Sequence, residues 1–262
     1  MIKINENIFQ IIIPYKDIWT TVTLARTEKG DLLLDSGSYD EDAEKYTLPF
    51  LKNCGVTADS LKYVFISHDH LDHSGGLSEL IKHYPKTTII SGSDGLKERF
   101  SEYNVVAPKE NEVYLDVLSI VKIVGHTIDS AALFDARTKT LISGDCLQAI
   151  GIVGSGNWAS NISYPVEYFD ALDKLSEMDI ESIITAHNYY PFTKNVISGK
   201  SEVERFIMCC YDALVLLKNF IVLNPNATDE EICKLHNVSK DTPSFGAWVV
   251  KSLRTAIESG RF

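Results

Sequence analysis

The sequence lacks several features that would place the protein outside the soluble enzymes. Its 25 Lys and Arg residues are outnumbered by 36 Asp and Glu residues, which gives a net charge of −11. A protein that binds the nucleic-acid backbone needs a basic face, so this balance argues against such binding. The longest apolar runs, such as residues 11–14 and 213–217, are far shorter than the roughly 18 residues that cross a membrane.

The five cysteines do not form a disulfide framework. Their number is odd, their spacing matches no framework, and the adjacent Cys209 and Cys210 would point in different directions on a helix. We expect reduced thiols, as in a cytosolic protein. The N-terminal stretch MIKINENIF has no basic segment followed by an apolar one, so no secretory signal is expected. Composition and length thus favour a soluble, cytoplasmic α/β domain, alone or with a small appendage.

Metal-binding residue types are most concentrated in residues 66–76, which read ISHDHLDHSGG. Imidazole nitrogens and carboxylate oxygens are ligands of zinc at roughly 2.0–2.2 Å. Residues 61–67 are apolar and β-branched enough for a buried strand, and residues 77–83 have the pattern of an amphipathic helix. The cluster therefore follows the carboxyl end of a strand, where α/β proteins usually hold their catalytic groups.

The rest of the chain alternates predicted strands and helices. Residues 40–54 have helical spacing, but Pro49 should kink or split this helix. The Gly- and Ser-rich residues 151–160 are predicted to form a loop beside the site. Two packed sheets flanked by helices fit the order of elements. Strands are predicted at residues 7–14, 19–26, 31–34, 87–90, 113–124, 131–134, 140–143 and 180–185, and helices at 93–103 and 166–178.

From residue 201 the pattern becomes purely helical. Residues 201–204 and 228–231 have the spacing of capping boxes, and Thr242-Pro243 has that of a helix start. These helices are predicted to cover the active site as a lid, with a partner-binding or dimerisation surface as the alternative. They are expected at residues 202–223, 228–236 and 242–258.

Three more candidate ligands lie at the ends of predicted strands. His126, Asp145 and His187 each follow an apolar segment. Taken singly, either histidine would more often be a structural residue. Taken together after the motif, the three are expected to converge with it at one sheet edge.

Residues 68–76 resemble the H-x-H-x-D-H-x-G-G signature of the metallo-β-lactamase-fold hydrolases, and the resemblance extends to about Pro191. It implies an α/β, αββα-sandwich fold with a catalytic domain at residues 1–196 and a C-terminal helical extension, the lid, at 197–262. It also implies that Asp35 hydrogen-bonds the metal-site loop. The implied ligands are His68, His70 and His126 for one metal, Asp72, His73 and His187 for a second, and Asp145 as a bridging carboxylate.

The resemblance implies two divalent ions, which we expect to be zinc, with iron or manganese as alternatives. Two cations roughly 3.5–4 Å apart can share a hydroxide and polarise a carbonyl oxygen. We therefore predict hydrolysis of an ester, thioester or lactone, with Asp72 as the catalytic residue that carries a proton. Ser67 and Thr127 either support the ligands or only form turns. The predicted walls of the substrate pocket are Trp158, Tyr189, Phe245 and Trp248.

Differences between this sequence and known branches of the family narrow the choice of branch. A diiron oxidoreductase of this fold would have Glu in place of His70 and an added flavodoxin domain. The lactonase branch has Tyr where this chain has Gln148. Glyoxalase II has a Gly-His-Thr like residues 125–127, but His-Glu-Tyr where residues 187–189 read HNY. A glyoxalase II-like or lactonase-like branch fits best.

Several functional alternatives remain open beside the hydrolase. They are an iron-dependent oxygenase or redox enzyme on the same ligands, a phosphodiesterase or nuclease, and an inactive scaffold. A β-lactam substrate is disfavoured because no secretion signal is expected. We expect a small-molecule substrate and neither a nucleic acid nor a membrane as partner, and the pattern is compatible with a homodimer.

Overall fold

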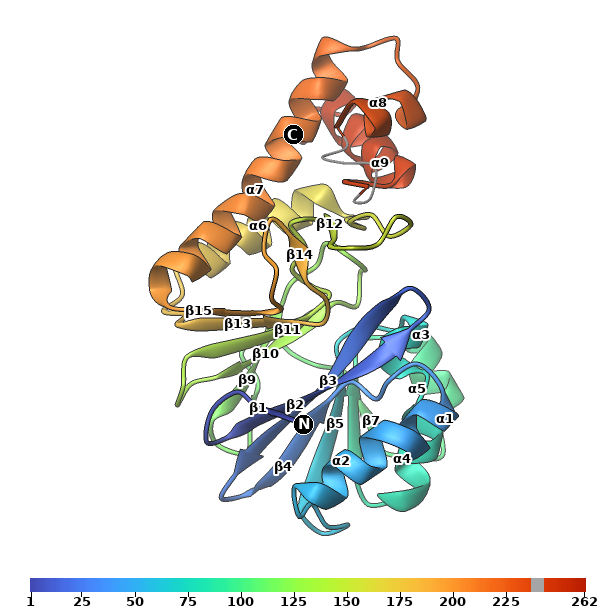
Figure 1. Ribbon diagram of the computed structural model, residues 1–262, viewed down its shortest axis with the longest axis vertical. Helices are drawn as coiled ribbons and strands as arrows, with labels where there is room; N and C mark the ends of the chain where they lie inside the picture. Colours follow the sequence, from blue (N-terminus) through green and yellow to red (C-terminus); the bar gives the residue numbers. More distant parts are fainter. Residues whose placement is uncertain (237–242) are drawn as a thin grey trace. The chain divides into compact units, whose positions relative to one another are not determined.

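The computed structural model describes residues 1–236 and 243–262 (Figure 1). The first of two compact units consists of Met1–Lys122, Ala131–Arg137 and Ile142–Gly144. The second consists of Ile123–Ser130, Thr138–Leu141 and Asp145–Phe262. The predicted boundary between residues 196 and 197 stays a prediction.

A seven-stranded mixed sheet forms the centre of the first unit. Its strands follow the order of the chain, antiparallel from β1 to β4 and parallel from β4 to β7. Because β4 and β5 are parallel, with Leu34 beside Phe65, the residues that follow them emerge at the same edge of the sheet. The strands are β1 (Ile2–Lys3), β2 (Ile8–Tyr15), β3 (Ile18–Thr27), β4 (Gly30–Leu34), β5 (Leu61–Ile66), β6 (Thr88–Ser91) and β7 (Val105–Val106).

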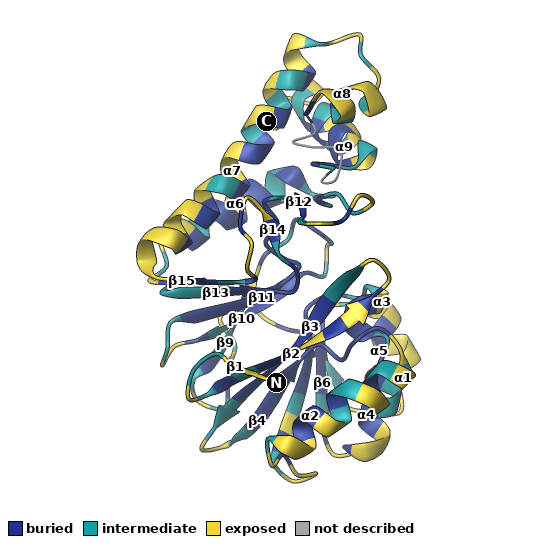
Figure 2. Ribbon diagram, viewed as in Figure 1, coloured by how far each residue is buried: buried dark blue, intermediate teal, exposed yellow. Residues whose placement is uncertain are grey.

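Helices pack against one face of this sheet, and the interior between them is apolar and buried (Figure 2). The period of two along β2 places Ile11 and Ile13 in this core, which also contains Leu80 and Ile81 from the helical layer. The predicted break at Pro49 is confirmed, because a π-helical turn separates two short α-helices there. The helical segments are α1 (Asp40–Asp42), η1 (Ala43–Thr47), α2 (Leu48–Asn53), α3 (Leu71–Ser74), α4 (Leu77–His83) and α5 (Asp94–Arg99).

A six-stranded sheet has the order β15-β13-β11-β10-β9-β8. Two further strands, β12 and β14, pair antiparallel in a small sheet of their own. Helix α6 (Pro165–Ser176) belongs to the second unit and buries six residues along one side. The remaining strands are β8 (Val113–Tyr114), β9 (Leu118–Lys122), β10 (Ala131–Asp135), β11 (Thr140–Gly144), β12 (Ile150–Ile152), β13 (Ser182–Thr185), β14 (Tyr189–Tyr190) and β15 (Val196–Ser198).

Three C-terminal helices, α7 (Lys200–Leu223), α8 (Asp229–His236) and α9 (Ala247–Glu258), are present as predicted. The start of the third differs from the prediction. Thr242 lies outside the described residues, and α9 begins at Ala247 with Gly246 as its N-cap. Phe245 instead pairs with Ser160 in a parallel bridge, so main-chain bonding to another segment prevails over the Pro-based helix start.

Helix α7 is long and apolar enough to cross a membrane when judged by length and composition alone. Its buried residues recur at intervals of three and four, from Val203 and Phe206 to Leu217 and Ile221. This stripe packs against α6 and β15 and against the other two C-terminal helices. Packing within the second unit therefore accounts for the buried stripe of α7.

Candidate metal centre

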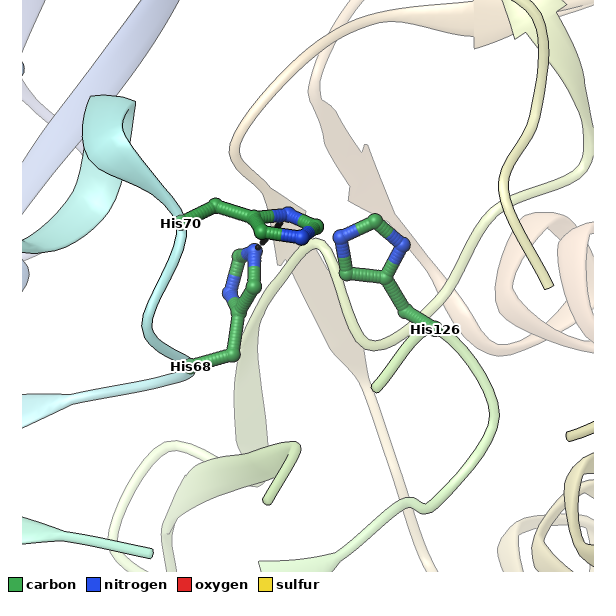
Figure 3. A group of neighbouring side chains, drawn as sticks. All are labelled: His68, His70 and His126. Atoms are coloured by element: carbon green, nitrogen blue, oxygen red, sulfur yellow. Dashed lines mark hydrogen bonds between the residues drawn. The ribbon is translucent and has the colours of Figure 1, made fainter. Parts of the chain in front are cut away.

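The motif loop leaves the end of β5 and passes into α3. His68 is fully buried, whereas His70 is partly accessible. Nε2 of His68 lies 3.0 Å from Nδ1 of His70. Figure 3 draws these two rings with the contact dashed, together with His126 from the second unit. Two nitrogens from neighbouring loop positions thus converge on one point within the first unit.

Asp35 fixes the orientation of His73. It follows β4 in the left-handed region, at φ 64°, a conformation that Asp tolerates better than most residues. Its carboxylate lies 2.7 Å from His73 Nδ1 and accepts bonds from the backbone N–H and the hydroxyl of Ser67, at 2.9 and 3.1 Å. Burial raises the pKa of this carboxyl, although His73 and Ser67 oppose the shift. Because Nδ1 is engaged, Nε2 of His73 is the nitrogen available to a metal.

Asp69, inside the motif, anchors the loop and is not a candidate ligand. It accepts hydrogen bonds from Ser74 at 2.8 Å, Ser93 at 2.8 Å and Arg99 at 2.7 Å. Ser93 also caps α5, through a bond from the backbone N–H of Leu96. The motif loop is therefore tied to both α3 and α5.

The Gly-Gly pair of the motif lets two backbone segments pack closely. A Cβ atom on Gly75 would lie 1.8 Å from the carbonyl oxygen of Ser38, and one on Gly76 would lie 2.6 Å from that of Ser36. The backbone N–H of Ser36 donates to the carbonyl of His73 at 2.8 Å. The glycines thus allow the segment after β4 to lie against the motif.

His126 is the ligand candidate from the start of the second unit. The preceding Gly125 lies against Tyr168, whose ring carbon Cδ2 would be 2.3 Å from a Cβ at that position. His126 Nδ1 lies 2.7 Å from the carbonyl oxygen of Asn161. Because a carbonyl only accepts, Nδ1 carries the proton, and Nε2 is the nitrogen whose lone pair could act as a metal ligand.

Asp145, His187 and Tyr189 lie together in the second unit. Nε2 of His187 is 3.3 Å from Oδ1 of Asp145, and the buried Tyr189 hydroxyl donates to the same oxygen at 2.9 Å. Nε2 of His126 lies 3.9 Å from the other carboxylate oxygen. Asp145 is therefore placed between two imidazole nitrogens while a phenol hydroxyl holds one of its oxygens.

The spacing of the donor atoms fits a metal ion. Two ligands of a tetrahedral zinc ion, with bonds of 2.0–2.1 Å, lie about 3.3 Å apart. Pairs within one unit match this value: 3.0 Å for His68 and His70, 3.4 Å for His73 Nε2 and Asp72 Oδ2, and 3.3 Å for His187 and Asp145. Neutral imidazole and carboxylate are also the ligand types that zinc, iron and manganese share.

The other predicted site residues occupy different positions. Ser67 bonds both Asp35 and, at 3.1 Å, Nδ1 of His68. Thr127 bonds the hydroxyl of Ser130 at 2.7 Å, which is the turn-forming alternative. Phe245 is buried and its ring packs 5.3 Å from that of His236, so its side chain is part of a core. Trp158 is partly accessible and Trp248 is half-exposed.

Sequence reasoning missed the residues that hold the ligands from a distance. Gln148, named there only as a departure from the lactonases, donates to the carbonyl of Asp145 and accepts from the backbone of Asn161. Tyr168 bonds the backbone of Gln148 through its hydroxyl. The position of Gln148, three residues after Asp145, was a weak sequence signal for a role near the site. The sequence held no such signal for Asn161 and Tyr168, because their contacts join segments far apart in the chain.

Comparisons with known proteins identify the family. Residues 20–187 match the family model of the Metallo-beta-lactamase superfamily. A hydroxyacylglutathione hydrolase from Pectobacterium atrosepticum is 26% identical over 155 residues, 55% of this chain and 56% of the relative. Another from Photobacterium profundum is 29% identical over 142 residues, 54% and 53% of the two chains. The aligned segments thus span about half the length of these relatives.

Solved structures show the fold. A metallo-beta-lactamase family protein from Thermus thermophilus superposes with a TM-score of 0.71 at 15% identity, covering 98% of this chain and 95% of that protein. The predicted α/β metallo-β-lactamase fold with a C-terminal helical extension is confirmed.

Proposed function

Because the chain belongs to the metallo-beta-lactamase superfamily, we propose that it is a metal-dependent hydrolase of small-molecule thioesters. The observation that carries this proposal is the ligand set. Every metal-ligand position of the family's binuclear pattern is filled by the expected residue type. The contacts of His73 and His126 through Nδ1, and the spacing of His187 and Asp145, also suit this set of ligand atoms.

We assign the ligands to two ions. Three imidazoles would hold one ion (Figure 3), and a mixed set of carboxylate and imidazole would hold the other. Asp145, flanked by two imidazole nitrogens in its own unit, would be the shared carboxylate. The first set is His68, His70 and His126, and the second is Asp72, His73, His187 and Asp145.

When bound, two such ions, which we propose to be zinc, would lower the pKa of water to near 7 and polarise the substrate carbonyl. Asp72 is the proposed proton carrier, with Oδ2 able to take a proton from the attacking water and pass it to the leaving group. Its side chain is only slightly exposed, at 12%, which keeps bulk water from competing with this transfer. Tyr189 keeps the carboxylate of Asp145 in place through its 2.9 Å bond.

The substrate class rests on the relatives. Those aligned over about half of their length are named hydroxyacylglutathione hydrolase, which favours a thioester over an oxygen ester or a lactone. A thiolate is also a better leaving group than an alkoxide, because a thiol has a much lower pKa than an alcohol. Proton transfer by Asp72 would accordingly matter most for esters and lactones.

The first test is metal content followed by a substrate panel. Protein purified without chelator should contain about two metal ions per chain, and thioesters should be hydrolysed faster than lactones, esters or phosphodiesters. One ion or fewer after reconstitution with zinc would contradict the two-ion assignment. Iron as the physiological ion, with redox turnover and no hydrolysis, would favour the redox alternative instead.

Substitution of the carboxylates tests the assigned roles. Asp145→Ala should lose metal and activity together, whereas Asp72→Ala should lower turnover by more than the roughly 10²–10⁴-fold typical of acid–base catalysis alone, because Asp72 is also a ligand. Asp170→Ala removes an exposed carboxylate on α6 and serves as the matched control. Turnover of Asp72→Ala near that of the control would remove Asp72 from the mechanism.

A further inference from the structure

Trp248, near the start of α9, reaches the loop that carries the partner of His126. Its indole N–H donates to the side-chain oxygen of Asn161 at 2.7 Å, across 87 positions of sequence. The ring is half-exposed, so burial alone does not fix it. It lies over Gly246, where an added Cβ would come within 2.9 Å of the ring atoms. Both the indole bond and this contact hold the ring in its position.

Asn161 has four hydrogen-bond partners. Its side-chain oxygen accepts from Trp248 and, at 3.0 Å, from the hydroxyl of Ser163. Its backbone N–H donates to Gln148 Oε1 at 2.8 Å, and its carbonyl accepts from His126 Nδ1 at 2.7 Å. Gln148 Nε2 lies 2.9 Å from the same imidazole nitrogen. A nitrogen cannot donate to the carbonyl and accept from this amide at once. The shorter contact with an acceptor-only carbonyl decides for the tautomer with hydrogen on Nδ1.

The segment before α9 is bonded to the same loop. The carbonyl of Ser244 accepts from the backbone N–H of Ser160 at 3.0 Å and from that of Gly151 at 3.3 Å. Ser244 also donates its hydroxyl to the carbonyl of His236 at the end of α8. The position of Asn161 is therefore coupled to the C-terminal helices by the main chain and, through Trp248, by a side chain.

We propose that Asn161 and Trp248 are positioning residues through which the C-terminal helices fix the ring orientation and tautomer of His126. This inference rests on the proposed function, because it assumes that His126 Nε2 binds a divalent metal. It gives the C-terminal helices a role that needs no direct contact with substrate. Loss of a hydrogen-bond partner behind a metal ligand typically weakens metal binding about 10–100-fold.

The test measures stepwise zinc affinities by competition with a chromophoric chelator. Trp248→Phe keeps a ring but removes the N–H. It should lower the affinity for one of the two zinc ions about tenfold and leave the affinity for the other unchanged. Asn161→Ala should have a similar effect, and the double variant should be no weaker than the more affected single variant, because both substitutions break one chain of bonds. Thr255→Ala, an exposed α9 residue whose hydroxyl bonds only its own helix, is the matched control.

A second variant keeps the indole N–H and displaces it. Gly246→Ala should push the Trp248 ring away and reproduce the selective loss. The imidazole N–H signal of His126, read by NMR in histidine-labelled protein, should exchange faster with water in each of these variants than in the Thr255 control. This signal reports the Nδ1 bond without depending on activity or metal.

The outcomes separate the inference from the proposed function. Unchanged zinc affinities and an unchanged N–H signal would overturn the positioning role while leaving the hydrolase proposal intact. An equal loss of affinity for both ions, together with a lowered melting temperature, would assign Trp248 to packing alone. That result would also overturn the positioning role. The wild-type protein could bind no zinc while the N–H signal still exchanges faster in the variants. That result would contradict the proposed function and not the coupling of Trp248 to His126.

Discussion

Gly75→Ala should destabilise the protein because of a backbone contact that the sequence does not display. The backbone at Gly75 is ordinary for any residue, at φ −69° and ψ −27°, so Ala adds no conformational strain. Its Cβ would nevertheless lie 1.8 Å from the carbonyl oxygen of Ser38, about 1.5 Å closer than a normal contact. Neither atom is the end of a flexible side chain, so a backbone segment must move.

The magnitude follows from the rigidity of that contact. Overpacking usually costs roughly 1–3 kcal/mol, and this case should reach about 3 kcal/mol or more. For a protein of this size, that corresponds to a melting temperature lower by about 6 to 12 °C. The displaced segment also includes the backbone bond from Ser36 to His73. We therefore expect zinc affinity to fall together with stability.

Thermal unfolding followed by circular dichroism, with zinc titration of the same samples, measures both effects. Gly156→Ala is the matched control, because no atom lies within 4 Å of the added Cβ and its φ is not positive. A Gly75→Ala protein that melts within a degree or two of this control would refute the reasoning.

Two further predictions concern buried polar groups. Tyr189→Phe removes the hydroxyl bonded to Asp145 and should weaken zinc binding about tenfold or more with little loss of fold; unchanged titration curves would show that the bond is unimportant. His236 lies buried between Phe220 and Phe245, and burial lowers the pKa of its imidazole. Below a pH of about 6.5 the unfolded chain binds a proton that the folded state resists, so stability should fall with pH, by at most ~1.4 kcal/mol per unit. His236→Leu should lose less stability between pH 7.5 and 5.5 than the wild-type protein does, as measured by urea unfolding. An equal change in the free energy of unfolding for the two proteins would contradict this prediction.

The sequence predicted the regular elements well where periodicity is strong. The strands β2, β3 and β4 lie within one or two residues of the predicted ranges, because apolar and β-branched runs bounded by turn residues mark buried strands clearly. The split at Pro49 followed from the ring's missing N–H, but the π-helical form of the preceding turn did not. The start of α9 was misplaced because Thr242-Pro243 satisfied a local rule, whereas the bonds of Ser244 and Phe245 to another segment decided the structure.

The candidate ligands could be identified from the sequence because histidine is rare, with seven residues in the chain, and because the motif loop, His126, Asp145 and His187 each come after an apolar segment. Their supporting contacts could not. A hydrogen bond between Trp248 and Asn161 depends on how α9 meets a loop, and neither residue has a chemistry that singles it out in a sequence. Phe245, predicted to line the substrate pocket, is buried beside His236, and its contact with a substrate stays a prediction. Burial and long-range bonding are tertiary properties, and local patterns carry little of either.

The motif contains candidate metal ligands and residues that shape the backbone. Asp69 bonds the loop to α5, Ser74 bonds Asp69, and the two glycines allow the segment after β4 to pack against the motif. These contacts all lie within the first unit and involve residues of the motif itself, so a short sequence signature can specify them. The ligands of the second unit depend instead on contacts spread from Gly125 to Trp248. Those contacts lie outside the signature, and so do the loops that would meet a substrate. A motif confined to residues 68–76 therefore identifies the metal chemistry and leaves the substrate to the rest of the chain.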